Sequence, residues 1–191
     1  MKHIALMLVV GLAGLAVAQS QPSPARMKLI EEAAYNRLTD QNDQWFSAGD
    51  FPRLIQNLRY VTLIWPHDYE SATNLGWMLG NIKRYDEELA VYKTYAQNNP
   101  DDPDNTLPEA NYYSRTRLYA NIPPLLEPRL SHHPHPNVYR TLAHAYEHLN
   151  RLPDAIRVWK LYLAGHPSDS AGAMNLARDT KKLASAPPPR G

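Results

Sequence analysis

Two segments of the chain carry one pattern of apolar and small residues, and this repetition constrains the fold more than any other feature. The first segment starts at Tyr69 and the second at Pro136. At an offset of 67 residues the pairs that match include Leu75 with Leu142, Gly76 with Ala143, Tyr92 with Trp159, Tyr95 with Tyr162, and Pro100 with Pro167. Each segment has two sets of residues at helical spacing, separated by a short break. The pattern predicts helix pairs that bury their apolar faces by stacking on neighbouring pairs.

The offset is about twice the 34-residue period of the tetratricopeptide repeat, and the chain resembles that family over residues 35–169. Two further segments, residues 35–68 and 103–135, fit the same spacing. The segment 103–135 is degenerate and one residue short. The resulting units are 35–68, 69–102, 103–135 and 136–169. The resemblance implies an all-α fold: a right-handed solenoid of about four antiparallel helix pairs plus a C-terminal capping helix.

Prolines and small residues add local expectations to this frame. Gly76 and Ala143 stand where two helices would touch, since a small side chain lets the backbones approach. Pro123, Pro124 and Pro128 crowd the second helix of the third unit. A proline inside a helix removes a hydrogen bond and clashes with the preceding turn. We therefore expect that helix to be short or bent.

The two ends of the chain have different patterns. Residues 1–18 combine a polar start, an apolar run and the small-residue site Ala16-Val17-Ala18, which is typical of an export signal cleaved after Ala18. We expect a periplasmic or secreted protein that is not inserted in the membrane after cleavage. Residues 19–34 should extend the first helix backwards, residues 170–185 should form the capping helix, and residues 186–191 should be a disordered tail.

Composition narrows the classes of function. The chain has 20 Lys+Arg against 19 Asp+Glu, so it has no general attraction to nucleic acid. It has no cysteine, which excludes disulfides, thiol catalysis and cysteine-ligated metal. No phosphate-binding glycine loop or nucleophile elbow is present. We expect a protein that is not an enzyme and uses no cofactor, and the oligomeric state is left open.

In the tetratricopeptide family the first helix of each unit lines a concave groove, which implies a protein or peptide partner. The residues at the corresponding positions are Asp43, Glu70, Thr73, Trp77, Asn81, Asn111, Arg115, Arg140, His144 and His148. We expect Trp77 to be an apolar anchor, because aromatic residues are frequent binding hot spots. Arg115 and Arg140 should point away from the helix-pair seam and take carboxylates of the partner. The chain would then be an adaptor, scaffold or assembly factor.

The histidines offer an alternative from another class. His144 and His148 are four residues apart on one predicted helix, a spacing that can hold a divalent metal ion. Glu147 is expected to point off this histidine face, so it could not act as a base for a bound water. The alternative function is a metal- or small-ligand-binding exported protein that uses the fourth unit.

Overall fold

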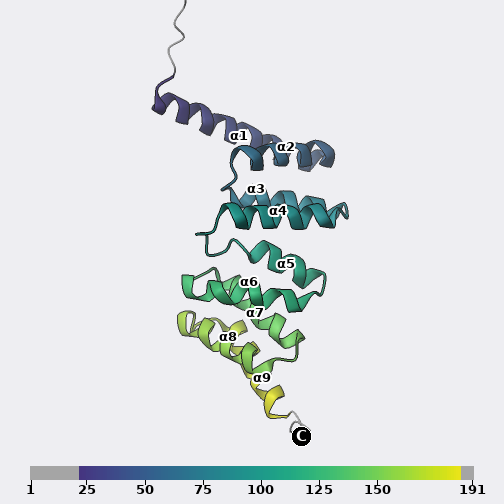
Figure 1. Cartoon of the computed structure of the whole chain (residues 1–191), viewed down its shortest axis with the longest axis vertical. Helices are drawn as coiled ribbons and strands as arrows, with labels where there is room; N and C mark the ends of the chain where they lie inside the picture. Colours follow the sequence, from purple (N-terminus) through teal and green to yellow (C-terminus); the bar gives the residue numbers. More distant parts are fainter. Residues whose placement is uncertain (1–21, 186–191) are drawn as a thin grey trace, which may run out of the picture. The chain divides into compact units, whose positions relative to one another are not determined.

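The computed structural model describes residues 22–185 of the chain (Figure 1). The chain divides into two compact parts, an N-terminal part (Met1–Arg37) and a C-terminal part (Leu38–Gly191). In the N-terminal part, residues 24–37 are helical and Lys28 pairs with Glu32 across one turn at 3.7 Å. The predicted export signal and the predicted disordered tail both lie outside the described residues.

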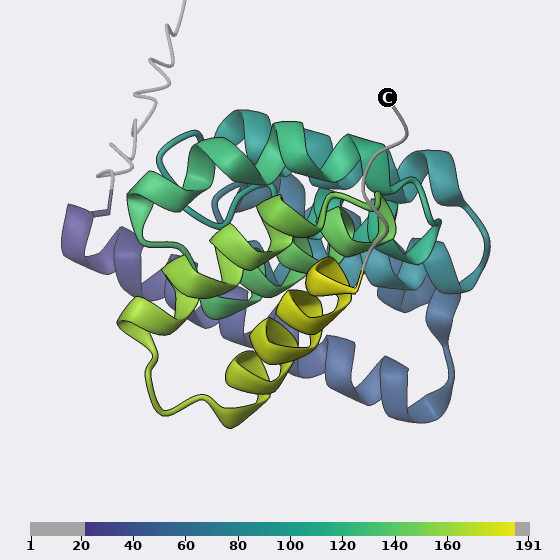
Figure 2. The same ribbon diagram turned by 90° about the horizontal axis from the view of Figure 1, so that it is seen from below.

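The regular structure of residues 22–185 is entirely helical, which confirms the all-α prediction. The elements, in chain order, are α1 (Pro24–Ala48), α2 (Phe51–Ile64), α3 (Tyr69–Asn81), α4 (Tyr85–Asn98), α5 (Leu107–Arg115), the 3-10 helix η1 (Tyr119–Asn121), α6 (Ile122–Leu126), the 3-10 helix η2 (Glu127–His132), α7 (Pro136–His148), α8 (Leu152–Gly165) and α9 (Ser170–Ala184). From α2 onward, consecutive helices pack on one another, and α9 lies against α8 (Figure 2). Among the described helices, none is long and apolar enough to cross a lipid bilayer.

The second helix of the third unit is broken into three short pieces, as its prolines predicted. Helix α6 has only five residues, and it lies between η1 and η2. Pro123 stands in the first turn of α6 and Pro128 in the first turn of η2, where the missing N–H has no helical partner to lose. Ile122 and Leu126 are nevertheless fully buried. The segment keeps its packing contacts although it cannot form one regular helix.

One turn joins the two helices of every unit. Gly49, Lys83, Arg117 and Asn150 all have left-handed backbone conformations, with φ between 61° and 71°. The residue after each of them donates its N–H to the carbonyl five residues earlier, for example Arg84 to Leu79 at 2.9 Å. This is the hydrogen bond of a Schellman helix end. The left-handed residues are 34, 34 and 33 residues apart, so the degenerate third unit has the same turn as the others.

Most of the buried apolar residues form two separate clusters. Residues of α2 and α3 form the first, around Leu58 and Leu79. Residues of α5 to α8 form the second, around Leu142 and Trp159. The contact between α4 and α5, which lies between these clusters, includes an ion pair from Arg115 to the buried Glu88. The middle of the stack is therefore joined partly by charge.

Candidate partner-binding site

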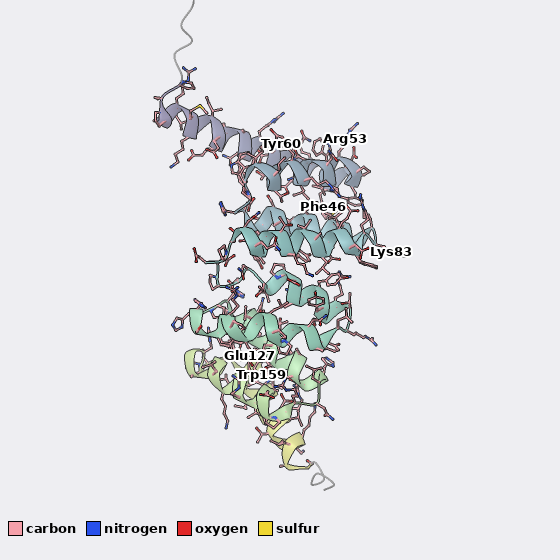
Figure 3. All side chains as sticks on the ribbon, in the orientation of Figure 1. Phe46, Arg53, Tyr60, Lys83, Glu127 and Trp159 are labelled. Atoms are coloured by element: carbon pink, nitrogen blue, oxygen red, sulfur yellow. The ribbon has the colours of Figure 1, made fainter. Side chains whose placement is uncertain are left out.

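Three exposed aromatic side chains gather where α1, α2 and α3 meet. Trp77 on α3 is 53% exposed, and Phe46 (labelled in Figure 3) and Phe51 are also exposed. The Phe46 ring centroid lies 6.1 Å from that of Trp77 and 6.1 Å from that of Phe51. Beside these rings is an open pocket of about 240 Å³. We call it the Trp77 pocket, and its lining is Asn42, Asp43, Phe46, Leu54, Leu58, Asn74, Trp77 and Met78.

The Trp77 pocket has an apolar base and a polar rim. Leu54, Leu58 and Met78 are buried and belong to the first core cluster, so the rigid part of the fold supports the pocket. The amide of Asn57 on α2 donates to Oδ1 of the buried Asn42 at 2.8 Å and to the carbonyl of Leu38 at 2.9 Å. These two hydrogen bonds fix the end of α1 against α2. They thereby set the position of the α1 side chains in the pocket wall.

One acidic residue lines the pocket, and another lies on the same helix as Trp77. Asp43 lines it, and Glu70 lies on α3 two turns before Trp77. Both residues are exposed, and in the part of the chain that the structure describes neither forms an ion pair. Both carboxylates can therefore accept a charged group from a partner.

The remaining polar residues predicted for the first three units lie outside the Trp77 pocket. The Thr73 hydroxyl donates to the carbonyl of Tyr69 at 2.9 Å, within its own helix. Asn81 is the exposed last residue of α3. On α5, Asn111 Oδ1 accepts a hydrogen bond from the Thr141 hydroxyl at 3.4 Å. The structure therefore brings Asp43 and Trp77 together in one pocket, while the other predicted residues lie outside its lining.

Arg115 does not point away from the helix seam, so that expectation is wrong. Its guanidinium donates to Glu88 on α4 at 2.6 Å, and Glu88 is only 3% exposed. The guanidinium also lies over the rings of Tyr85 and Tyr112, at 5.6 and 5.5 Å from their centroids. A buried carboxylate needs a partner, because an uncompensated charge in the interior is costly. Arg115 therefore stabilises the contact between α4 and α5.

Arg140 has a similar structural role between α7 and the start of α9. It donates to the Tyr162 hydroxyl at 2.8 Å and to Asp169 at 2.6 Å. Asp169 is the N-cap of α9 and accepts the backbone N–H of Gly172 at 3.0 Å. Hydrogen bonds from Tyr162, Gly172 and Arg140 lower the pKa of Asp169. The expectation that Arg140 points away from the seam is therefore wrong as well.

The two histidines of α7 have separate protein partners. His144 Nδ1 lies 3.1 Å from Glu147 Oε1, and the His148 ring stacks on Tyr119 at 4.0 Å between centroids. The expectation that Glu147 points away from the histidine face is wrong, because residues three apart on a helix are neighbours. Among residues 22–185, no group of three or more histidine or acidic side chains could hold a metal ion.

The sequence interpretation missed a buried charged cluster under α9. Asp179 is fully buried, and it accepts hydrogen bonds from Trp159 Nε1 at 3.2 Å and from Arg178 Nε at 3.0 Å. Burial raises the pKa of Asp179. Burial alone would raise the pKa of Glu147 too, but hydrogen bonds from His144 and Asp179 and the charge of Arg178 lower it to about 2. The sequence held one indication of this cluster: Asp179 stands three residues after Leu176, within the apolar stripe of α9.

Solved structures with the same arrangement of helices are known. A double mutant of MamA RS-1 superposes with a TM-score of 0.62 at 15% identity, over 79% of this chain and 85% of that one. MamA 41-end from Desulfovibrio magneticus RS-1 superposes with a TM-score of 0.61 at 15% identity, over 78% of this chain and 85% of that one. MamA MSR-1 superposes with a TM-score of 0.57 at 21% identity, over 80% of this chain and 88% of that one. No model of a protein family and no curated protein matches the chain. The likeness shows the fold: the chain is an all-α solenoid of tetratricopeptide-like helix pairs, which it shares with the MamA structures.

Proposed function

We propose that this chain is a non-catalytic protein-binding module of the cell envelope, an adaptor, scaffold or assembly factor. Its partner is a peptide or protein segment that contacts the first helices of the units. The observation that carries the proposal is Trp77, a large aromatic side chain that is half exposed beside an open pocket with an apolar base. Aromatic anchors that enter or line such pockets supply a large share of the binding energy in protein interfaces.

The contacts of the charged side chains support the non-catalytic part of the proposal. In the described residues, the charged side chains Arg115, Glu147, Asp169 and Asp179 have shifted pKa values and have partners in the helix contacts. His144 contacts Glu147 and Trp159, and His148 stacks on Tyr119. These contacts favour a structural role for the charged groups over a chemical one.

The envelope location is a proposal from residues 1–18, which carry the pattern of an export signal. N-terminal sequencing of the exported protein tests it, and we expect the mature chain to begin at Gln19. An export-blocked variant supplies the control, because it should retain Met1. An exported, membrane-bound form that still starts at Met1 would contradict the location.

Quantitative affinity capture tests the binding proposal. Envelope extract is passed over immobilised wild type, Trp77→Ala and Tyr60→Ala. Tyr60 is a matched control, because it is 52% exposed and lies outside the Trp77 pocket. We expect a partner that Tyr60→Ala retains and that Trp77→Ala binds about 30-fold more weakly, a loss of about 2 kcal/mol. Equal retention by all three proteins would refute the Trp77 pocket as the binding site.

A further inference from the structure

The charged residues near the Trp77 pocket on α1 and α3 are acidic. Residues 38–48 of α1 and 69–81 of α3 contain Asp40, Asp43 and Glu70, and no lysine or arginine. Asp50 is already engaged, since it pairs with Arg53 at 3.1 Å and caps α2. Asp43 remains available in the pocket wall, and Glu70 remains available on the same helix as Trp77. The surroundings of the Trp77 pocket are therefore complementary to a cation.

The groups that would attract an acidic partner are occupied elsewhere. Arg115 pairs with Glu88 and Arg140 pairs with Asp169, so a carboxylate within the protein already compensates the charge of each guanidinium. Breaking the first of these pairs would leave a buried carboxylate without compensation. Asp43, in contrast, forms no ion pair among the described residues and lies in the wall of the Trp77 pocket. This favours a basic partner at the pocket over the acidic partner that the sequence alone suggested.

The pocket also combines the two groups that bind a basic side chain best. The exposed face of a tryptophan attracts lysine or arginine through its negative quadrupole, and a carboxylate in the same pocket adds a charged hydrogen-bond acceptor. Phe46 and the buried leucines offer an apolar surface to the neighbouring side chain of a ligand. A volume of about 240 Å³ equals roughly eight water molecules at ~30 Å³ each, which suits individual side chains of an extended segment.

We infer that the partner is a peptide segment with a lysine or arginine next to an apolar residue. The cationic group lies between Asp43 and the Trp77 ring, and the apolar side chain contacts the base of the pocket. This inference rests on the proposed function, because it names the chemistry of the partner that the Trp77 pocket takes. It predicts binding that weakens with added salt, since exposed charge pairs are screened.

An array of immobilised short peptides of random sequence tests the inference with purified protein. Wild type is compared with Trp77→Ala, Asp43→Asn and Asp43→Lys. Asp40→Asn is the matched control, because Asp40 is exposed on the same helix but does not line the pocket. Circular dichroism checks that each variant keeps its helices. All of the substituted side chains are exposed, so we expect the fold to persist.

We expect wild type and Asp40→Asn to retain peptides enriched in lysine or arginine beside leucine, isoleucine or phenylalanine. Asp43→Asn should bind these peptides about 3- to 10-fold more weakly, and Asp43→Lys should select acidic peptides instead. If Trp77→Ala abolishes binding but the retained peptides show no basic preference, the inference is wrong and the proposed function stands. If Trp77→Ala retains the same peptides as wild type, or if wild type retains no peptide, the inference and the proposed function are both wrong.

Discussion

Replacing Gly76 by alanine should destabilise the protein, although alanine is the better helix former. Gly76 lies within α3, and its Cα faces the buried ring of Tyr92 on α4. A Cβ atom at this position would lie 2.2 Å from Tyr92 Cε1 and 2.4 Å from Cζ. Non-bonded carbon atoms do not approach this closely, so either the ring or the whole helix must move.

The size of the effect follows from two opposing terms. An extra methyl group in a packed core costs about 1–3 kcal/mol, and a contact of 2.2 Å with a buried ring calls for the upper end of that range. The gain in helix propensity from glycine to alanine offsets about 1 kcal/mol of this. We therefore expect the free energy of unfolding of Gly76→Ala to be about 2 kcal/mol lower than that of wild type.

Urea denaturation followed by circular dichroism measures this loss. Gly165→Ala is the control, because a Cβ there meets no atom within 4 Å and the variant should be as stable as wild type or slightly more stable. Tyr92→Leu makes room for the methyl group, so Gly76→Ala should cost less in that background. The reasoning is refuted if Gly76→Ala unfolds at the wild-type urea concentration, or if the two substitutions are additive.

Four further predictions use the same denaturation assay or hydrogen exchange. Arg115→Ala should lower the free energy of unfolding by about 1–3 kcal/mol, because the buried Glu88 loses its partner, and an unchanged midpoint would contradict the ion pair. Lys83→Gly should raise the free energy of unfolding by about 1 kcal/mol, because Lys83 has a left-handed backbone with φ of 64°. A loss of stability in this variant would contradict the left-handed conformation at this turn. Hydrogen bonds hold the pKa of Asp169 below its ordinary 3.8, so they stabilise the fold fully above pH 3.8 and progressively less as the pH falls. Asp169→Asn should therefore be less stable than wild type near neutral pH, and the difference in the free energy of unfolding should close below pH 3.8. A difference that does not change with pH would contradict this. Amide exchange should be faster over 119–132 than in α3 or α7, because that segment lacks a regular helix, and equal protection would oppose it.

The candidate site could be predicted only in part. Trp77 was found from its place in the repeat, since helical spacing identifies the exposed face of a first helix. Its neighbour Phe46 was missed, because the pocket depends on how α1, α2 and α3 meet in space. The orientations of Arg115 and Arg140 were predicted wrongly, and their contact with a partner stays a prediction. Their partners, Glu88 and Asp169, lie 27 and 29 residues away, where no local pattern indicates a contact.

The all-α fold could be predicted from the amino-acid sequence, because apolar spacing and helix breakers act within a few residues and recur with the repeat. The sequence also predicted the broken helix at Pro128 and the close approach at Gly76, which are local steric effects. Only the tertiary structure showed that Lys83, Arg117 and Asn150 adopt the same left-handed turn as Gly49, because three residue types other than glycine conceal the repeated conformation. Which charges remain available to a partner could likewise be read only from the packed helices. A charge on a helix surface is free or paired according to the register of the neighbouring helix, and packing of the whole stack sets that register.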